Sequence, residues 1–507
     1  MEAAMAAKRI VTACMAAAAL LLVSFGVAPT AAASRMELQR GFSVAHDTSY
    51  SQFQPVLSDP TGVFALGFLR VNSTVLDLAV LHLPSSFPLW RAIPADRPAP
   101  WSAPASLSFN GSLVLTHGAT NQVLWSTDAA AAGDRAVLLN TSNLQIKSDS
   151  SPGAVWQSFD YPSDTIVQDQ NLTSSAALHT IDRRFAMRLG SNYFALYIEP
   201  PPSSYGGVSA AMYWKHTALE AKAQIDPAGG PIYARVEPDG YLAMYQKEGA
   251  PADVMSFDTF NHGIRAFRRI TLEPDSNLRA YYWDGSRWNL DYTTITDSCE
   301  LPTTCGAYSV CVPPSGRCAC LANATNGSGC AAASVGNALC GTTGREVVGG
   351  LYWEARRQGV EPANKELLGF EHELSAEDCE ARCARNCSCW GAVYSNGTGY
   401  CYIMDYPAQL MVAADERKVG YFKVRSMEEA AGRGGRAAGV TAALLATGVA
   451  VVVVAAAFGT YRVWDKRRHT EEEIRRQLGA DGDGLSPGPY KNLGSFSSVE
   501  LSNSFRR

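Results

Sequence analysis

The sequence predicts a mainly β protein of several domains, part of which is held together by disulfides. Short alternating apolar runs recur through residues 35–298, and twelve of the 13 cysteines lie between Cys299 and Cys401. A chain of 507 residues is too long for one ordinary domain, so we expect three or four. The net charge of -5 is small for this length and argues against a nucleic-acid binder.

The first residues have the organisation of a secretory signal peptide. Lys8 and Arg9 precede an apolar run over residues 10–27, and an Ala-Ala-Ala sequence then supplies a small-residue cleavage site. We therefore expect residues 1–33 to be removed. Cys14 is lost with them, which leaves an even number of cysteines.

Residues 35–298 contain no cysteine and have the pattern of short β-strands. Runs such as SLVLTH from Ser112 and YLAMYQ from Tyr241 place apolar side chains at every second position after a turn-forming residue. Many short strands separated by turns predict an all-β sandwich, barrel or prism. Because this region is too long for one such unit, we divide it into domains at 34–174 and 175–298.

The first cysteine group lies within 32 residues, a segment too short to bury a core of its own. Disulfides must therefore hold it together, and its spacing alone does not choose among the 15 pairings that six cysteines allow. A zinc site is the alternative, but an oxidising compartment and the absence of paired C-x-x-C knuckles disfavour it. The group consists of Cys299, Cys305, Cys311, Cys318, Cys320 and Cys330.

The second cysteine group contains a predicted helix. Ser375 can cap the helix, and Asp378 lies near its positive end. Cys379 and Cys383 are four residues apart, hence on one helical face, and both can reach the same neighbouring sheet. Cys-Ser-Cys at 387–389 alternates as a strand does. The group consists of Cys340, Cys379, Cys383, Cys387, Cys389 and Cys401.

A second apolar segment predicts a membrane-spanning helix. Residues 437–460 contain no charged side chain, and a helix needs roughly 20 residues to cross a bilayer. The basic residues from Arg462 to Arg468 place the tail, residues 461–507, in the cytoplasm. Cysteines and N-x-S/T sequons all precede the segment, so we expect a single-pass type I protein of the plasma membrane with its N-terminus outside. The sequon asparagines are Asn72, Asn110, Asn140, Asn171, Asn323, Asn326, Asn386 and Asn396.

Three motifs together resemble those of the plant S-domain proteins, which include S-locus glycoproteins and G-type lectin receptor kinases. WQSFDYPSDT from Trp156 is similar to the family signature W-Q-S-F-D-x-P-[ST]-D-T. CGAYSVC from Cys305 looks like the start of the family's EGF-like module, and CEARCARNCSCWGAVY from Cys379 resembles its PAN/apple motif. The motifs occur in the family's order, and the likeness covers roughly residues 35–465.

The resemblance implies tandem β-prisms of the bulb-lectin type, an EGF-like module at 299–332 and an α+β PAN/apple domain at 340–425. It also implies that the WQSFD stretch closes the first prism, with Trp156 as a core anchor. An acid–base pair of Asp160 and Asp164 is the alternative, but no nucleophile, histidine or metal set accompanies them.

The family pattern, with the helical pair of cysteines, implies a set of disulfides. The pairings expected are Cys299–Cys311, Cys305–Cys318, Cys320–Cys330, Cys340–Cys387, Cys379–Cys401 and Cys383–Cys389.

Bulb lectins bind mannose through Q-x-D-x-N-x-V-x-Y, in which polar side chains bond the sugar hydroxyls and valine packs against a sugar carbon. Residues 273–281, EPDSNLRAY, keep Asp275, Asn277 and Tyr281 but place Arg279 at the valine position. These three are the candidate carbohydrate-binding residues, and the alternative is a strand with a turn-forming Asp and an interior Tyr. Three further stretches, beginning at residues 108, 139 and 237, keep less of the motif, so we expect weak or absent mannose binding.

The residues after the apolar segment contain no kinase element. The 47 residues that follow Thr460 have no phosphate-binding loop and no HRD or DFG sequence. We therefore expect a plant receptor-like protein that is not an enzyme, needs no cofactor or metal, and acts through a partner receptor kinase after its ectodomain binds a glycan or protein. It could also form homo- or hetero-oligomers. The alternative is a non-signalling, wall-tethering or decoy lectin-like membrane protein.

Overall fold

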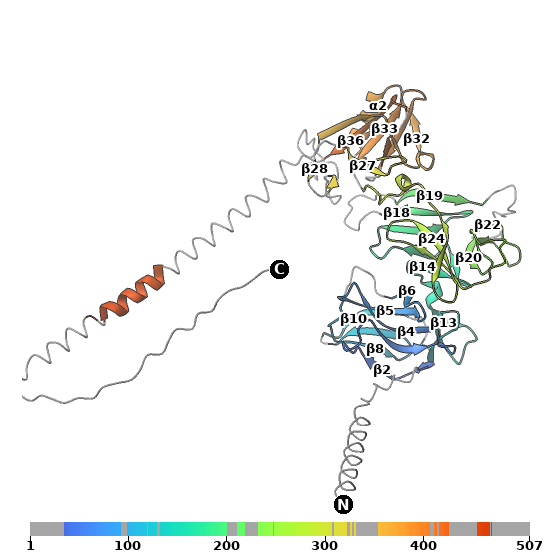
Figure 1. Ribbon diagram of the computed structural model, residues 1–507, viewed down its shortest axis with the longest axis vertical. Helices are drawn as coiled ribbons and strands as arrows, with labels where there is room; N and C mark the ends of the chain where they lie inside the picture. The colour runs from blue at the N-terminus through green and yellow to red at the C-terminus, as the bar shows by residue number, and fades with distance from the viewer. Residues whose placement is uncertain are drawn as a thin grey trace, which may run out of the picture. The chain divides into compact units, whose positions relative to one another are not determined.

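The computed structural model describes residues 35–424, with gaps, and part of a helix nearer the C-terminus. Beyond residue 424 it describes residues 454–466 and 468. The longer gaps are 93–98, 200–209, 219–231 and 331–352, and the shorter ones are 119, 129–131, 247, 307–308, 322–324, 327–328, 387, 406–409 and 413–414. Within these limits the chain is mainly β, as the sequence predicts (Figure 1).

The first domain consists of three sheets around one apolar core, the arrangement expected of a β-prism. The sheet orders are β1-β11-β12-β13, β10-β9-β8-β2 and β3-β4-β5-β6, with β7 also paired to β5. Alternate side chains of a strand point into the core. On β8, Ala105, Leu107 and Phe109 are buried, whereas the serines between them are half-buried. The strands are β1 (Glu37–Gln39), β2 (Phe42–Ala45), β3 (Phe53–Ser58), β4 (Phe64–Val71), β5 (Val75–His82), β6 (Phe87–Arg91), β7 (Ala99–Pro100), β8 (Ala105–Phe109), β9 (Leu113–His117), β10 (Gln122–Ser126), β11 (Arg135–Leu138), β12 (Leu144–Lys147) and β13 (Ala154–Gln157).

Three tryptophans, one from each sheet, meet at one end of this core. Trp90 lies on β6, Trp125 on β10 and Trp156 on β13, with ring centroids 5.6 to 6.0 Å apart in edge-to-face pairs. Such pairs contribute roughly 0.5–1.5 kcal/mol beyond the burial of their area. Trp156 is therefore an anchor at the point where the three sheets converge, as the resemblance implied.

The residues after Trp156 form a hydrogen-bonded corner. The 3-10 helix η1 (Ser158–Asp160) begins here, and the hydroxyl of Ser158 accepts a hydrogen bond from Leu144 N at 3.0 Å. The amide of Asn143 donates to Gln157 Oε1 at 2.9 Å. These contacts join the corner to β12 and close the first domain.

The chain passes from the first domain to the second within strand β14 (Thr165–Val167). Val167 belongs to the apolar core of the first domain, and Ile166 belongs to that of the second. Neighbouring side chains of a strand point to opposite faces, so one short strand contributes to both cores. The boundary between the two cores therefore lies some residues before position 175, the boundary that was predicted from the sequence.

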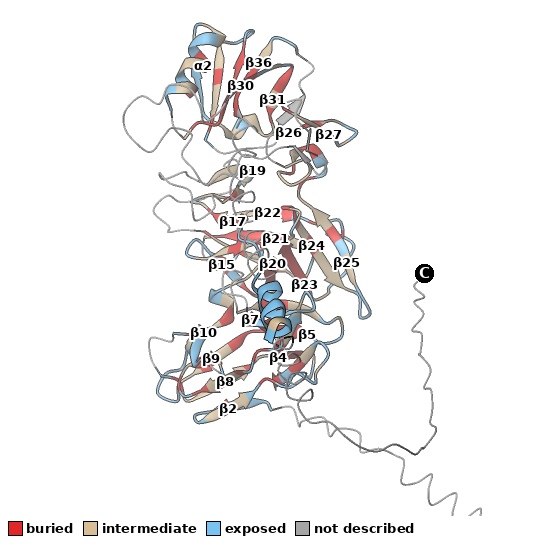
Figure 2. Cartoon of the chain, turned by 90° about the vertical axis from the view of Figure 1, so that its left-hand side faces the viewer, coloured by how far each residue is buried: buried red, intermediate tan, exposed pale blue. Residues whose placement is uncertain are grey.

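The second domain repeats the three-sheet arrangement with four strands in each sheet. The orders are β14-β23-β24-β25, β15-β20-β21-β22 and β16-β17-β18-β19, all antiparallel. Buried residues lie along the strands of both domains and exposed ones on the loops (Figure 2). The remaining strands are β15 (Asn171–Thr173), β16 (Ala177–His179), β17 (Phe185–Leu189), β18 (Tyr193–Ile198), β19 (Ala211–Thr217), β20 (Tyr233–Glu237), β21 (Tyr241–Tyr245), β22 (Asp253–Ser256), β23 (Arg268–Leu272), β24 (Leu278–Trp283) and β25 (Trp288–Thr293).

A buried arginine and a buried histidine join these two domains. The guanidinium of Arg269, from β23, lies 3.7 Å from the ring centroid of Phe87 in the first domain and 3.9 Å from that of Tyr281. His82 of the first domain is 2% exposed and contacts aromatic rings at centroid distances of 4.7 to 6.0 Å. Those rings belong to Phe64, Phe267, Trp283 and Trp288.

The cysteine-rich segment and the predicted PAN domain share one sheet. Strand β26 (Ser309–Val312) pairs with β27 (Arg317–Cys320) and, in parallel, with β35 (Leu410–Val412), which pairs with β31 (Val360–Pro362). Arg357 adds a link by donating from Nη1 to the carbonyl of Cys320 at 2.7 Å. The other elements of this segment are η2 (Ser298–Glu300), β28 (Thr325–Asn326) and β29 (Gly329–Cys330).

The PAN region consists of a five-stranded sheet, β30-β36-β33-β34-β32, with helix α2 (Ala376–Arg385) beside it (Figure 1). Ser375 caps the helix as predicted, since its hydroxyl accepts from Asp378 N at 3.1 Å. Buried Lys423 donates to the carbonyls of Cys383 and Asn386, where the negative end of the helix favours a cation. The elements are β30 (Trp353–Gln358), η3 (Lys365–Leu367), β32 (Phe370–His372), β33 (Gly391–Ser395), β34 (Tyr400–Met404) and β36 (Lys418–Val424).

Four of the expected disulfides are present. Cys299–Cys311 and Cys305–Cys318 cross-link the first group, and Cys379–Cys401 and Cys383–Cys389 join helix α2 to its sheet region. Cys320 is also disulfide-bonded. Its expected partner Cys330, and the pairing of Cys340 with Cys387, lie outside the residues whose side chains are described.

Among the residues after 425, the structure describes a helix at positions 454–466. Within the described part of the chain, no helix has the length and apolar character needed to span a membrane. Most of the predicted span, residues 437–460, and most of the predicted cytoplasmic tail lie outside the described residues.

Replacing Trp156 by alanine should destabilise the first domain by about 3–5 kcal/mol, because the substitution leaves a cavity where the three sheets meet. The matched control is Tyr161→Ala, which removes a ring stacked on Trp156 but 59% exposed. Hydrogen exchange of first-domain peptides measures the local free energy of opening. Equal exchange in the two variants would contradict the role given to Trp156.

Acidification should weaken the joint between the two domains through His82. Burial lowers the pKa of His82 from 6.5 to about 4, so the unfolded chain binds this proton more tightly than the folded chain. The stability that depends on the neutral ring is complete above pH 6.5 and declines as the pH falls toward 4. Thermal unfolding across this range should show a smaller pH dependence in His82→Gln than in the parent chain, and identical profiles would exclude His82 as the cause.

Candidate functional site

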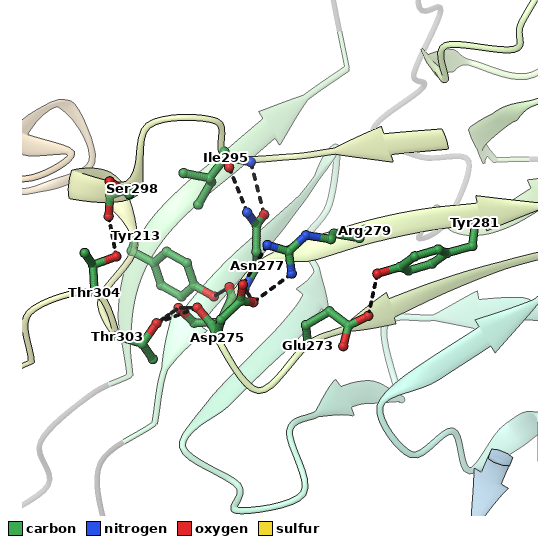
Figure 3. A network of polar contacts seen from close by, with 11 residues as sticks. Tyr213, Glu273, Asp275, Asn277, Arg279, Tyr281, Ile295, Ser298, Thr303 and Thr304 are labelled. Atoms are coloured by element: carbon green, nitrogen blue, oxygen red, sulfur yellow. Dashed lines mark hydrogen bonds and ion pairs between the residues drawn. The ribbon is translucent and has the colours of Figure 1, made fainter. Parts of the chain in front are cut away.

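The predicted carbohydrate-binding residues lie in the turn between β23 and β24 and along β24. Ser276 N donates to Glu273 O at 2.9 Å, and Ser276 has a positive φ of 68°, so the Pro-Asp-Ser sequence forms a tight turn. The backbone carbonyl of Asp275 accepts a hydrogen bond from Thr303 Oγ1 at 2.6 Å. The turn is thereby tied to the start of the cysteine-rich segment (Figure 3).

Asn277 is buried and fully engaged within the protein. Its side-chain amide donates from Nδ2 to Ile295 O at 2.7 Å and accepts at Oδ1 from Ile295 N at 3.1 Å (Figure 3). The residue is 1% exposed. The asparagine amide therefore pairs with the backbone after β25 and does not reach a sugar hydroxyl from this position.

Asp275 is occupied by the arginine that replaces the motif's valine. Arg279 donates from Nη1 and Nη2 to the two carboxylate oxygens of Asp275, at 3.0 and 2.6 Å. Bidentate pairs of this kind are geometrically specific. The hydrogen bond to Asp275 raises the pKa of Arg279, which stays charged. The substitution thus removes the apolar contact for a sugar and also occupies the carboxylate.

The hydroxyl of Tyr281 donates to Glu273 Oε1 at 2.8 Å, and Glu273 stands where the motif has glutamine (Figure 3). Burial and this hydrogen bond raise the pKa of Tyr281 to about 12. The guanidinium of Arg269 lies on the tyrosine ring. Motif positions that would face a ligand are here bonded to one another.

The arrangement recurs on a second sheet of this domain, and part of it recurs on the third. Tyr245 donates to Glu237 Oε1 at 2.7 Å, with the guanidinium of Arg235 4.7 Å from its ring centroid. On the third sheet, Arg188 lies 5.3 Å from the ring of Tyr197 and forms an ion pair with a glutamate. These clusters were not predicted from the sequence, although E-P-D-x5-Y occurs at both 237 and 273. An arginine, a tyrosine and a glutamate therefore stabilise each sheet.

In the first domain, the motif residue kept in the stretch from 139 also bonds within the protein. Asn143 is 5% exposed and bonds Gln157, and its Oδ1 accepts from Ser158 Oγ at 3.3 Å. Among the described residues, no group of three or more His, Cys, Asp or Glu side chains could hold a metal ion. The polar groups of the candidate site thus support the fold, and the structure brings Asp275, Asn277 and Tyr281 onto one strand region without leaving their side chains free.

We expect no measurable mannose binding at residues 273–281, because ligand binding would have to break the Asp275–Arg279 and Asn277–Ile295 contacts. Arg279→Val should not create binding, since the amide of Asn277 stays engaged. Calorimetry with mannose and mannotriose measures this directly. A micromolar affinity that disappears in Asn277→Ala and Tyr281→Phe would show that the site opens and would contradict this expectation.

Three family models match the chain. The D-mannose binding lectin model matches residues 94–186, the S-locus glycoprotein domain model matches 239–325, and the PAN domain model matches 366–424. The S-locus match extends across position 298, where the sequence analysis divided the second domain from the cysteine-rich segment. A solved two-domain lectin, the fetuin-binding agglutinin of Scilla campanulata, is 14% identical, and the match covers 52% of this chain and 97% of that lectin with a TM-score of 0.19.

Two curated relatives from Arabidopsis thaliana indicate the family. The G-type lectin S-receptor-like serine/threonine-protein kinase SD1-29 is 26% identical over 71% of this chain and 46% of its own length, so the chain spans about half of that relative. The PAN domain-containing protein At5g03700 is 43% identical, and the match covers 92% of both chains. With this identity over nearly the whole length and three family models in the order lectin, S-locus glycoprotein and PAN, the chain belongs to the plant S-domain family.

Proposed function

We propose that this protein is a cell-surface recognition protein of the plant, whose lectin-like and PAN ectodomain binds an external glycan or protein ligand. It has no enzymatic activity of its own and transmits binding through a partner receptor kinase. The observation that carries the proposal is how much of this chain and of its kinase relatives the sequence match covers. Two of the kinase relatives match 71% and 68% of this chain but only 46% and 44% of their own length.

The surface of the ectodomain supports an extracellular location. The exposure of six sequon asparagines is described, and all six are exposed, which an added glycan requires. Disulfides cross-link both cysteine groups, as is common in oxidising compartments. We infer that residues 1–33 direct secretion and that residues 437–460 anchor the chain as a type I protein of the plasma membrane. The exposed asparagines are Asn72, Asn110, Asn140, Asn171, Asn386 and Asn396.

The bulb-lectin motif at 273–281, whose side chains are hydrogen-bonded within the protein, limits where a ligand can bind. Because its polar side chains are engaged with one another, recognition at this strand is not expected. Rigid prisms can present ligands or partners on other surfaces, such as exposed turns and clefts. An ectodomain of joined domains, with Arg269 and the shared β26–β35 sheet as connections, is suited to hold such surfaces in a constant arrangement.

Signalling would depend on the C-terminal residues. The basic residues from Arg462 to Arg468 would lie against anionic lipid, each contributing about 1 kcal/mol near the surface. The serines that follow are then available to the kinase of a partner. They are Ser495, Ser497, Ser498, Ser502 and Ser504.

Deleting residues 470–507 tests the proposal against a tethering or decoy role. We expect recovery of a partner kinase from plant membranes to fall several-fold when the tail is deleted, because the tail is the segment available to it inside the cell. The matched control replaces the five tail serines by alanine, which keeps the length and should lower phosphorylation without releasing the partner. Unchanged recovery and unchanged signalling after deletion would favour a non-signalling tether, and phosphotransfer by the purified chain alone would contradict the absence of enzymatic activity.

A further inference from the structure

A cavity of about 840 Å³ lies next to the corner that closes the first domain. Its walls come from the ends of β6 and β10, from the stretch 156–164 and from residues 175–183 at the start of the second domain. The two walls are joined, since His179 N donates to Ser163 O at 2.9 Å. Cavities of roughly 300–1,000 Å³ hold small ligands, so this one is large enough for one or two sugar rings.

One wall of the cavity is aromatic. Trp90, Trp125 and Trp156 contribute to it, and Tyr161 stacks on Trp156 at 5.7 Å with an angle of 9° between the ring planes. Tyr161 is 59% exposed, although its backbone carbonyl is fixed by a hydrogen bond from Trp90 Nε1 at 2.8 Å. A tyrosine ring with a fixed backbone and an accessible face is suited to packing against the apolar C–H face of a sugar.

The cavity also contains polar groups that the protein leaves without partners. Asp164 accepts at Oδ1 from Ser163 Oγ and Thr165 Oγ1, at 3.3 and 3.0 Å, and no described residue donates to its Oδ2. His179 lines the cavity too, and its Nδ1 is buried with no hydrogen-bond partner among the described residues. A buried polar group without a partner costs free energy, and this applies to His179 Nδ1, whereas Asp164 Oδ2 is an acceptor that a hydroxyl group of a ligand can use.

The charges around the cavity favour an uncharged ligand. Burial lowers the pKa of His179 to about 4, so its ring is neutral at physiological pH. Burial also raises the pKa of Asp164. Arg91 forms a buried ion pair with Asp77 and is not free to bind an anion. Arg183 also lines the cavity but is exposed, and the carboxylates of Asp128, Asp160 and Asp164 outnumber it. What remains is an acceptor-rich, aromatic-walled space that disfavours an anionic ligand.

We propose that this cavity binds a neutral, hydroxyl-rich ring compound of the size of one or two pyranose units, at a place distinct from the bulb-lectin motif. Hydroxyl groups would donate to Asp164 Oδ2 and meet His179, while a C–H face would pack on Tyr161. The inference rests on the proposed recognition function and specifies the ligand class and where it binds.

Tryptophan fluorescence of the full-length chain, purified in detergent from plant membranes, tests the inference with cellobiose, xylobiose, mannobiose and galactobiose as probes. Three tryptophans line the cavity, so a bound sugar should change the emission in a saturable way. At least one probe should bind, and Tyr161→Ala and Asp164→Asn should each weaken it tenfold or more. Hydrogen exchange confirms that both variants keep the folded first domain.

Two matched controls locate the site. Tyr461→Ala removes a tyrosine of similar exposure, 58%, outside the ectodomain and should leave the affinity unchanged. Tyr281→Phe alters the bulb-lectin motif and should also leave it unchanged. No saturable change with any probe up to 10 mM (about ten-thousandfold above a micromolar affinity), or binding that Tyr161→Ala and Asp164→Asn do not weaken, would overturn the inference. If the inference fails in either way while a partner kinase is still recovered with the parent chain, the receptor role stands and only the ligand site is wrong.

Discussion

The meeting of three sheets around one apolar core is the constraint on which the first domain depends. Trp90, Trp125 and Trp156 each come from a different sheet and contact one another edge to face. Loss of one ring would leave the other two without their packing partner, because close-packed interiors do not refill such a space. The hydrogen-bonded corner comes directly after Trp156 in the sequence, and the chain then enters the core of the second domain at Ile166.

The domains are joined to one another by side-chain and backbone contacts. The Arg269 guanidinium lies between aromatic rings of the two prisms, where cation–π contacts offset part of the cost of burying its charge. Further along, β26 of the cysteine-rich segment pairs with β35, so backbone hydrogen bonds join this segment to the PAN region. The disulfides of that segment then stabilise a sheet that it shares with the PAN region.

The same polar residue types that bind sugar in a bulb lectin here bind one another. A carboxylate, an amide and a tyrosine hydroxyl are suitable ligands for sugar hydroxyls only while they lack partners in the protein. Arg279 and Glu273 supply partners to Asp275 and Tyr281, and a backbone segment supplies them to Asn277. Near the tryptophans the situation is reversed, since Asp164 and His179 retain polar atoms that no described residue satisfies.

The sequence by itself determined the local features: the strand alternation, the capping of α2 by Ser375, the disulfide-rich character and, through motif resemblance, the pairing of Cys379 with Cys401. These depend on residues close in sequence or on a recurring pattern. Only the tertiary structure decided that Val167 and Ile166 enter different cores, that β26 joins the PAN region, and that the motif residues of 273–281 are internally bonded. Such outcomes depend on which distant strands become neighbours, and the partner of a polar side chain, such as Ile295 for Asn277, is chosen by that packing and not by spacing along the chain.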